Sequence, residues 1–97
     1  VASGTCETGI LICGTGIGMG IVANKHKGIR AAVCESVTAA QLARDHNNAN
    51  ILTLGGKTLG IELAKGILKC WLETSFGGGR HQQRLNKINE IEQRLKG

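Results

Sequence analysis

The sequence predicts a single domain built as an open α/β sheet. Three short runs, at residues 9–13, 29–34 and 50–54, have apolar residues on both faces rather than in alternation, which is typical of parallel strands covered by helices on both faces. A segment with a helical pattern follows each run, and this alternation is the order that right-handed crossovers between parallel strands produce. The length of 97 residues suffices for one small hydrophobic core.

The first two runs each lead into a short predicted helix. The run GILIC ends at Cys13 and passes into a glycine-rich loop, which predicts a central strand followed by a helix over about residues 16–24. The run IRAAVC is followed by Ser36, whose hydroxyl can cap a helix over about residues 36–45. Residues 1–8 look like the end of a helix and a turn, so we expect part of the domain to precede this chain.

The last two predicted helices differ in how much of their surface is apolar. The run NILTL leads through Gly55 and Gly56 into a helix over about residues 58–73 that is apolar around most of its circumference. The final helix, about residues 81–95, carries a narrow apolar stripe, which indicates packing against its own domain or a partner. The Gly-Gly-Gly bend between them is too short to be a linker, so residues 1–97 are predicted to form one domain.

The composition restricts the classes of partner. The formal net charge of +5 weakly favours an anionic partner. Trp71 and Phe76 are the only aromatic residues, so we expect a core of Ile, Leu, Val and Ala and no stacking surface for nucleic acid. A small phosphorylated ligand agrees better with the basic clusters.

The four cysteines form neither a zinc motif nor a disulfide framework. Cys6, Cys13, Cys34 and Cys70 include no C-x-x-C pair and no zinc-type spacing with a histidine. We therefore expect no metal site and reduced thiols in the cytoplasm. No segment resembles a signal peptide and the apolar runs are far shorter than a membrane span, so we expect no membrane partner.

A glycine-rich loop follows the first run, at the edge where parallel sheets bind their ligands. Alternating glycines let the backbone approach an anion, although one or two would also satisfy a tight turn. A dinucleotide-binding fingerprint would require glycine or alanine at the position of Met19 or Ile21. Glu35 does lie where such a fold has its ribose-binding acid, but the glycine spacing fails, so a dinucleotide site is a weak alternative. No G-K-S/T follows directly on this loop, which excludes a Walker loop there. The loop comprises Gly14, Thr15, Gly16, Ile17 and Gly18.

Four side chains are candidates for chemistry. Cys13 is either small apolar filler or a thiolate stabilised by the loop amides, and its position beside the loop favours a base or nucleophile. His46, at a helix C-terminus, is equally well a dipole partner or a general acid. Arg80 and Arg84 share a face at a helix N-terminus, where cations are disfavoured, so they are either a phosphate site or a solvated basic face.

Several motifs together are more specific than any one alone. The segments ILICGTGIGM, AQLARDHNNANILTLGGK and GGRHQQRL follow one another along the chain. With these segments the sequence resembles the family of ribose-5-phosphate isomerase B and lactose-pathway galactose-6-phosphate isomerase, and is more similar to the first branch. The resemblance covers essentially all 97 residues.

The resemblance implies a Rossmann-like three-layer α/β/α sandwich and an enzyme of carbohydrate metabolism. The implied reaction interconverts ribose 5-phosphate and ribulose 5-phosphate through an enediolate, without metal or organic cofactor. In the matching motifs Cys13 is the base that transfers the proton, and the amides of residues 14–18 hold the sugar and the enediolate. His46 is the acid that opens the furanose ring, and Asn47 contacts the substrate.

The remaining implied features concern phosphate and assembly. Arg80 and Arg84 match the phosphate ligands of the family, whose sites lie between subunits, so a homodimer or tetramer is implied. Lys57 stands where the family usually has arginine, and it can neutralise phosphate only as a point charge. The family's first strand, which ends in an Asp-His pair, and the helix and strand after it have no counterpart here. We therefore expect residues 1–97 to be the C-terminal two-thirds of the domain, and the alternative function is a truncated phosphosugar-binding or assembly domain without catalysis.

Overall fold

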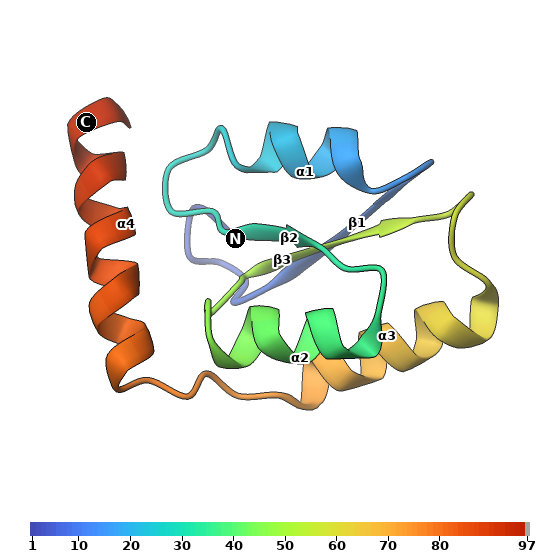
Figure 1. Ribbon diagram of the computed structural model, residues 1–97. Helices are drawn as coiled ribbons and strands as arrows, with labels where there is room; N and C mark the ends of the chain where they lie inside the picture. The colour runs from blue at the N-terminus through green and yellow to red at the C-terminus, as the bar shows by residue number, and fades with distance from the viewer. Residues whose placement is uncertain (97) are drawn as a thin grey trace.

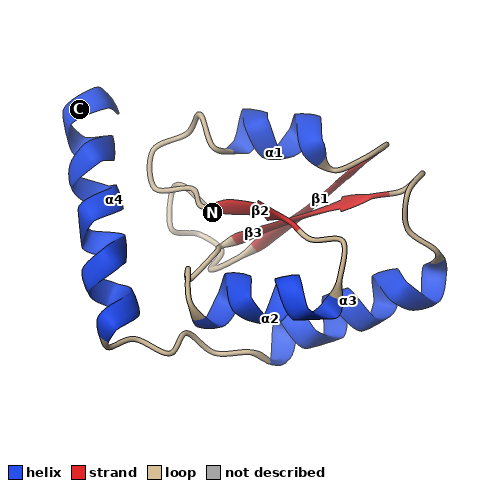
Figure 2. Ribbon diagram, viewed as in Figure 1, coloured by secondary structure: helices blue, strands red, loops and turns tan. Residues whose placement is uncertain are grey.

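The computed structural model describes residues 1–96 and confirms the predicted α/β fold (Figures 1 and 2). A parallel sheet of three strands is combined with four helices in these residues. No helix in this range is long and apolar enough to cross a membrane. The elements in chain order are β1 (Gly9–Cys13), α1 (Ile17–Ala23), β2 (Ala31–Val33), α2 (Val37–Asp45), β3 (Ile51–Gly55), α3 (Ile61–Glu73) and α4 (Arg80–Lys96).

In the described residues the sheet order is β1-β3-β2, so β1, predicted as a central strand, lies at an edge of this three-stranded sheet. The central strand is β3, and all five of its residues are buried. β1 pairs with β3 alone among the described strands, in a register that sets Ile10 beside Leu52 and Ile12 beside Leu54. On β1, the side chains of Ile10 and Ile12 remain 41% and 67% exposed. The apolar run thus predicted the strand correctly, and in the described residues this strand has one neighbour.

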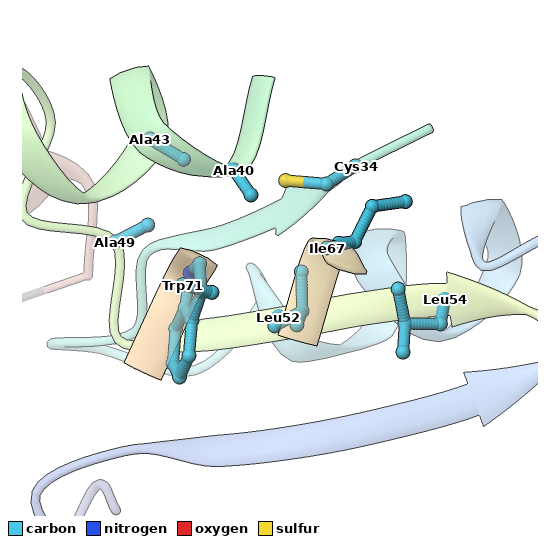
Figure 3. Close-up of a cluster of buried hydrophobic side chains, with 8 residues drawn as sticks. All are labelled: Cys34, Ala40, Ala43, Ala49, Leu52, Leu54, Ile67 and Trp71. Atoms are coloured by element: carbon cyan, nitrogen blue, oxygen red, sulfur yellow. The ribbon is translucent and has the colours of Figure 1, made fainter. Parts of the chain in front are cut away.

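The helices form one layer on each side of the sheet, with α1 over one face and α2 and α3 over the other (Figure 1). In the main core Trp71 and Ile67 of α3 pack against Leu52 of β3, beneath the small side chains of α2 (Figure 3). Small residues such as Ala40 let the backbone of α2 approach closely. Trp71 is the largest fully buried side chain, so the expectation of a purely aliphatic core is wrong.

The helix boundaries follow from local capping. The hydroxyl of Ser36 accepts a hydrogen bond from the backbone N–H of Ala39, which confirms the predicted N-cap of α2. α3 begins three residues later than predicted, because the N–H groups of Thr58 and Leu59 bond back to the carbonyl of Gly55 and form a turn. Residues 1–8 form turns and bends rather than a helix end.

α4 lies beside the end of the sheet at which the strands begin (Figure 1). Of its apolar stripe only Leu85 is buried, whereas Ile88, Ile91 and Leu95 are 47%, 48% and 79% exposed. Near its C-terminus the Lys96 Nζ donates to the carbonyl of Asn24 at 2.7 Å. The stripe therefore packs on its own domain at one residue and leaves three apolar side chains uncovered in the single chain.

Candidate active site

The loop after β1 holds the Cys13 thiol against backbone amides. The N–H of Gly16 donates to the Cys13 Sγ at 3.1 Å. Gly16 is the N-cap of α1 with a φ of 82°, and a Cβ at this position would lie 3.0 Å from the carbonyl carbon of Leu54. Only glycine combines this left-handed backbone with so close an approach to β3. The position of the thiol beside the loop therefore depends on one glycine.

Amide donors lower the pKa of the Cys13 thiol. The largest contribution comes from the backbone N–H of Met19, and those of Gly16, Thr15 and Gly18 act in the same direction. Partial burial opposes them by disfavouring the charged form. The amides stabilise the thiolate because they place positive dipole ends at the sulfur. A group poised to accept a proton thus lies at the carboxyl edge of the sheet.

The loop after β3 joins Cys13 at this edge. The N–H of Gly56 donates to the carbonyl of Cys13 at 2.7 Å, and the N–H of Lys57 donates to the carbonyl of Gly14 at 2.9 Å. These two bonds continue the pairing of β1 with β3 beyond the strands. Gly18 has open space where a side chain would project. Cys13, the glycine loop and Lys57 therefore form one group, referred to below as the thiol half-site.

His46 lies at the C-cap of α2 and stacks on a second histidine. Its ring and that of His81 have centroids 4.2 Å apart and an interplanar angle of 17°. The His46 Nε2 is 3.7 Å from the Asp45 Oδ2, with both side chains about 40% exposed. Burial lowers the pKa of His81, and the nearby His46 and Arg80 lower it further. These neighbours disfavour the charged form of His81, because a protonated ring would lie close to other positive charge.

Arg80 and Arg84 project from the first two turns of α4, and both are exposed. The predicted substrate contact Asn47 is exposed beside the histidine pair. His81 brings α4 against the end of α2, because it stacks on His46. These residues form a second group, referred to below as the histidine-arginine half-site. Its members are His46, Asn47, Arg80, His81 and Arg84.

The two half-sites lie at opposite ends of the sheet. Cys13 ends β1 and Gly55 ends β3, whereas His46 and Asn47 precede the first residue of β3. Four residue steps along β3 separate the two edges by about 13 Å at roughly 3.3 Å per step. Figure 1 shows α4 and the end of α2 on one side of the molecule and the tips of β1 and β3 on the other. A single chain therefore does not bring Cys13 and His46 together.

Comparison with known proteins identifies the family. The model of the Ribose/Galactose Isomerase family matches residues 1–88. The chain belongs to this family. Ribose-5-phosphate isomerase B of Escherichia coli (strain K12) is 54% identical over 94 residues, which cover 97% of this chain and 63% of the relative. D-erythrulose-4-phosphate isomerase of Pectobacterium atrosepticum is 48% identical over 96 residues, which cover 99% of this chain and 63% of the relative.

Solved structures agree with the family assignment. Ribose-5-phosphate isomerase B of Clostridium thermocellum superposes with a TM-score of 0.93 at 53% identity, over 95% of this chain and 62% of that chain. The type B ribose 5-phosphate isomerase of Trypanosoma cruzi gives a TM-score of 0.93 at 46% identity, over 96% of this chain and 63% of that chain. The chain therefore has the α/β fold of these enzymes and spans less than two thirds of their length.

His81 belongs to the histidine-arginine half-site, although the sequence predicts no role for it. It stands inside the GGRHQ motif, between the two arginines that were assigned to phosphate. Its position in that motif is the one feature of the sequence that points to a role at the site. Its stacking on His46 joins residues 35 positions apart, and no sequence pattern predicts such a contact. Among residues 1–96 no three side chains of His, Cys, Asp or Glu gather as metal ligands would.

Proposed function

We propose that this chain carries the core of a sugar-phosphate isomerase that interconverts ribose 5-phosphate and ribulose 5-phosphate. The observation that carries the proposal is the Cys13 thiol held 3.1 Å from the Gly16 amide, in a loop whose glycine is sterically required. Family membership and the E. coli and C. thermocellum relatives support the reaction class and the five-carbon substrate. The activity would place the protein in pentose phosphate metabolism.

The proposed chemistry is a proton transfer between neighbouring carbons. The Cys13 thiolate removes the proton from C2 of the open-chain aldose, and the electron pair forms the C1–C2 double bond of an enediolate. Amides of residues 14–18 stabilise the charge that develops on the oxygens. The thiol then returns the proton to C1, and the hydroxyl proton passes from O2 to O1, which yields the ketose. The lowered pKa of Cys13 suits this role, since a base acts best near the working pH.

His46 is proposed as the acid that opens the furanose ring. Its protonated imidazole would donate to the ring oxygen, and exposed Asn47 would contact the sugar hydroxyls. The stack with His81 orients the ring, and the His46 side chain is 41% exposed. This step precedes proton abstraction, because C1 is a carbonyl only in the open form.

Phosphate recognition is proposed for the cationic residues of both half-sites. Arg80 and Arg84, one helical turn apart and exposed, suit bidentate binding of phosphate oxygens. Lys57 of the thiol half-site would add a point charge. With a substrate between them, these cations offset its negative charge and fix its orientation.

We infer that complete sites form between subunits of a homodimer or tetramer. The separation of the half-sites to opposite edges of one sheet supports this, because a second copy can supply the missing half. The uncovered Ile88, Ile91 and Leu95 on α4 supply an apolar surface for such an assembly. A cytoplasmic location is also proposed, since the four cysteines are free in the described residues.

The test is an isomerase assay with a set of phosphosugars of four, five and six carbons. The four-carbon member is included because the P. atrosepticum relative is named for D-erythrulose 4-phosphate. The assay uses the 97-residue chain and the same chain extended to the length of its relatives. We expect turnover of ribose 5-phosphate that Cys13→Ala abolishes. Phosphosugar binding without turnover in both forms would instead favour the non-catalytic alternative.

A further inference from the structure

Arg44 is a half-buried residue with contacts to three separate segments. Its Nε donates to the carbonyl of Thr74 at 3.3 Å. Its Nη1 donates to the Asn48 Oδ1 at 3.1 Å and to the carbonyl of Ala49 at 2.6 Å. The guanidinium carbon lies 5.5 Å from the centre of the Trp71 ring. One side chain thus joins the turn after α2, the segment after α3 and the main core.

The Arg44 guanidinium is bound by neutral acceptors and not by a carboxylate. Among residues 1–96 no carboxylate forms an ion pair with Arg44. Removing a cation from water without a counter-ion costs free energy. The oxygen acceptors and the Trp71 ring offset this cost for Arg44. Such an arrangement is typical of an arginine that fixes the course of the backbone, because its planar fork reaches several carbonyls at once.

The turn held by Arg44 has an unfavourable backbone. Asn48 has a φ of 44°, the one positive value among the described residues other than glycine. The carbonyl of Asn48 also accepts a hydrogen bond from the Arg30 Nε at 2.9 Å. The left-handed region is disfavoured for residues other than glycine, although asparagine enters it more often than most, and such a conformation persists where its surroundings hold it. Two arginines therefore hold the turn that follows His46.

The hydrogen bond to Thr74 connects Arg44 to the segment that leads into α4, the second element of the histidine-arginine half-site. Thr74 begins the segment that leads to α4, and in this segment the N–H of Gly77 donates to the carbonyl of Asp45 at 2.9 Å. α4 then places His81 against His46. Arg44 consequently lies between the two chain segments whose relative position determines the histidine stack.

We propose that Arg44 is a positioning residue that sets the orientation of His46 for ring opening. The proposal rests on the proposed isomerase function, and it assigns Arg44 no contact with substrate. Loss of its three hydrogen bonds frees the turn and the Thr74 segment, so the His46 ring leaves its stacked position. Ring opening then slows, whereas proton transfer at Cys13, at the opposite edge of the sheet, is unaffected.

The first measurement requires no activity. Imidazole resonances of His46 and His81 are recorded by NMR in the wild type, Arg44→Met, Arg44→Lys and the control Arg94→Met, an exposed arginine of α4. Stacked rings shift each other's resonances, so we expect Arg44→Met to move both signals toward free imidazole and Arg94→Met to leave them in place. Arg44→Lys should be intermediate, because an ammonium cannot reach all three acceptors. Unmoved signals in Arg44→Met would overturn the proposal.

The second measurement separates ring opening from proton transfer. Ribulose 5-phosphate stays in the open form, because the C5 oxygen that would close its ring carries the phosphate. Exchange of its C1 hydrogen in D₂O therefore requires Cys13 but no ring opening. We expect Arg44→Met to reduce kcat from ribose 5-phosphate by about 10- to 100-fold, as expected for a displaced catalytic group, and to leave the exchange rate unchanged. Equal losses of both rates would contradict the positioning role. No exchange in the wild type would overturn the proposed function instead, and the NMR comparison would still decide the role of Arg44.

Discussion

The backbone N–H of Gly16 donates a hydrogen bond to the Sγ of Cys13 at 3.1 Å, and Gly16 has this position because its φ is 82°. The same residue lies so close to β3 that a Cβ would be 3.0 Å from the Leu54 carbonyl carbon. The geometry of the loop, the packing of α1 on the sheet and the ionisation of the thiol are therefore linked through one residue.

A pair of glycine substitutions separates folding from function in this loop. Gly16→Ala should destabilise the protein by about 1–2 kcal/mol for the left-handed backbone alone, and by more from the contact with β3. Gly18→Ala, which meets open space within α1, should be neutral or stabilising by about 0.5–1 kcal/mol. Urea unfolding measures both, and the isomerase assay should show reduced kcat/KM for Gly18→Ala, because its side chain would occupy the space expected for the sugar.

The two outcomes are independent of each other. A Gly18→Ala variant with unchanged stability and unchanged kcat/KM would contradict the placement of the sugar against this residue. A Gly16→Ala variant as stable as the wild type would contradict the steric argument.

The lowered pKa of Cys13 predicts alkylation at a lower pH than for an unfolded thiol. Since the amides lower the folded pKa, the thiolate fraction in the folded protein exceeds that in the unfolded chain at every pH near neutrality. The rate of iodoacetamide modification, followed for the Cys13 peptide by mass spectrometry, should therefore rise with pH earlier in native protein than in urea. Coincident pH profiles would show that the loop amides do not stabilise the thiolate.

Phosphate binding should depend on the two arginines of α4 and not on other cations of that helix. Arg80→Met and Arg84→Met should each weaken competitive inhibition by inorganic phosphate about tenfold or more, since a charge-assisted hydrogen bond contributes roughly 1.5–3 kcal/mol. Arg94→Met is the matched control, because Arg94 is exposed near the other end of α4. Equal inhibition constants for Arg80→Met and Arg94→Met would contradict the assignment of Arg80 to phosphate.

Local signals in the sequence were sufficient for the strands, the helices and the cap at Ser36. The apolar run of β1 and the glycines after it predicted a loop beside Cys13, and the bonds from Gly56 and Lys57 show that the loops after β1 and β3 meet. These features depend on residues close in sequence or on the rule that parallel strands end at one edge.

Features that depend on long-range packing were not predictable from one sequence. The strand order leaves β1 at the edge, because β3 inserts between β1 and β2, and no local pattern distinguishes these arrangements. The burial of Trp71, the stack of His46 on His81 and the contacts of Arg44 join segments far apart along the chain. Only the folded chain brings them together.

The central claim is that a complete site takes Cys13 from one subunit and His46 from another, and mixed variants test it most directly. Cys13→Ala and His46→Asn are each inactive in this account. Their subunits are unfolded together, refolded and assayed from ribose 5-phosphate. In a dimer with shared sites, half of the molecules are mixed and each has one intact site of two, so we predict recovery of about 25% of wild-type activity. If the mixture stays as inactive as its components, although native mass spectrometry shows mixed dimers, the claim of a shared site is contradicted.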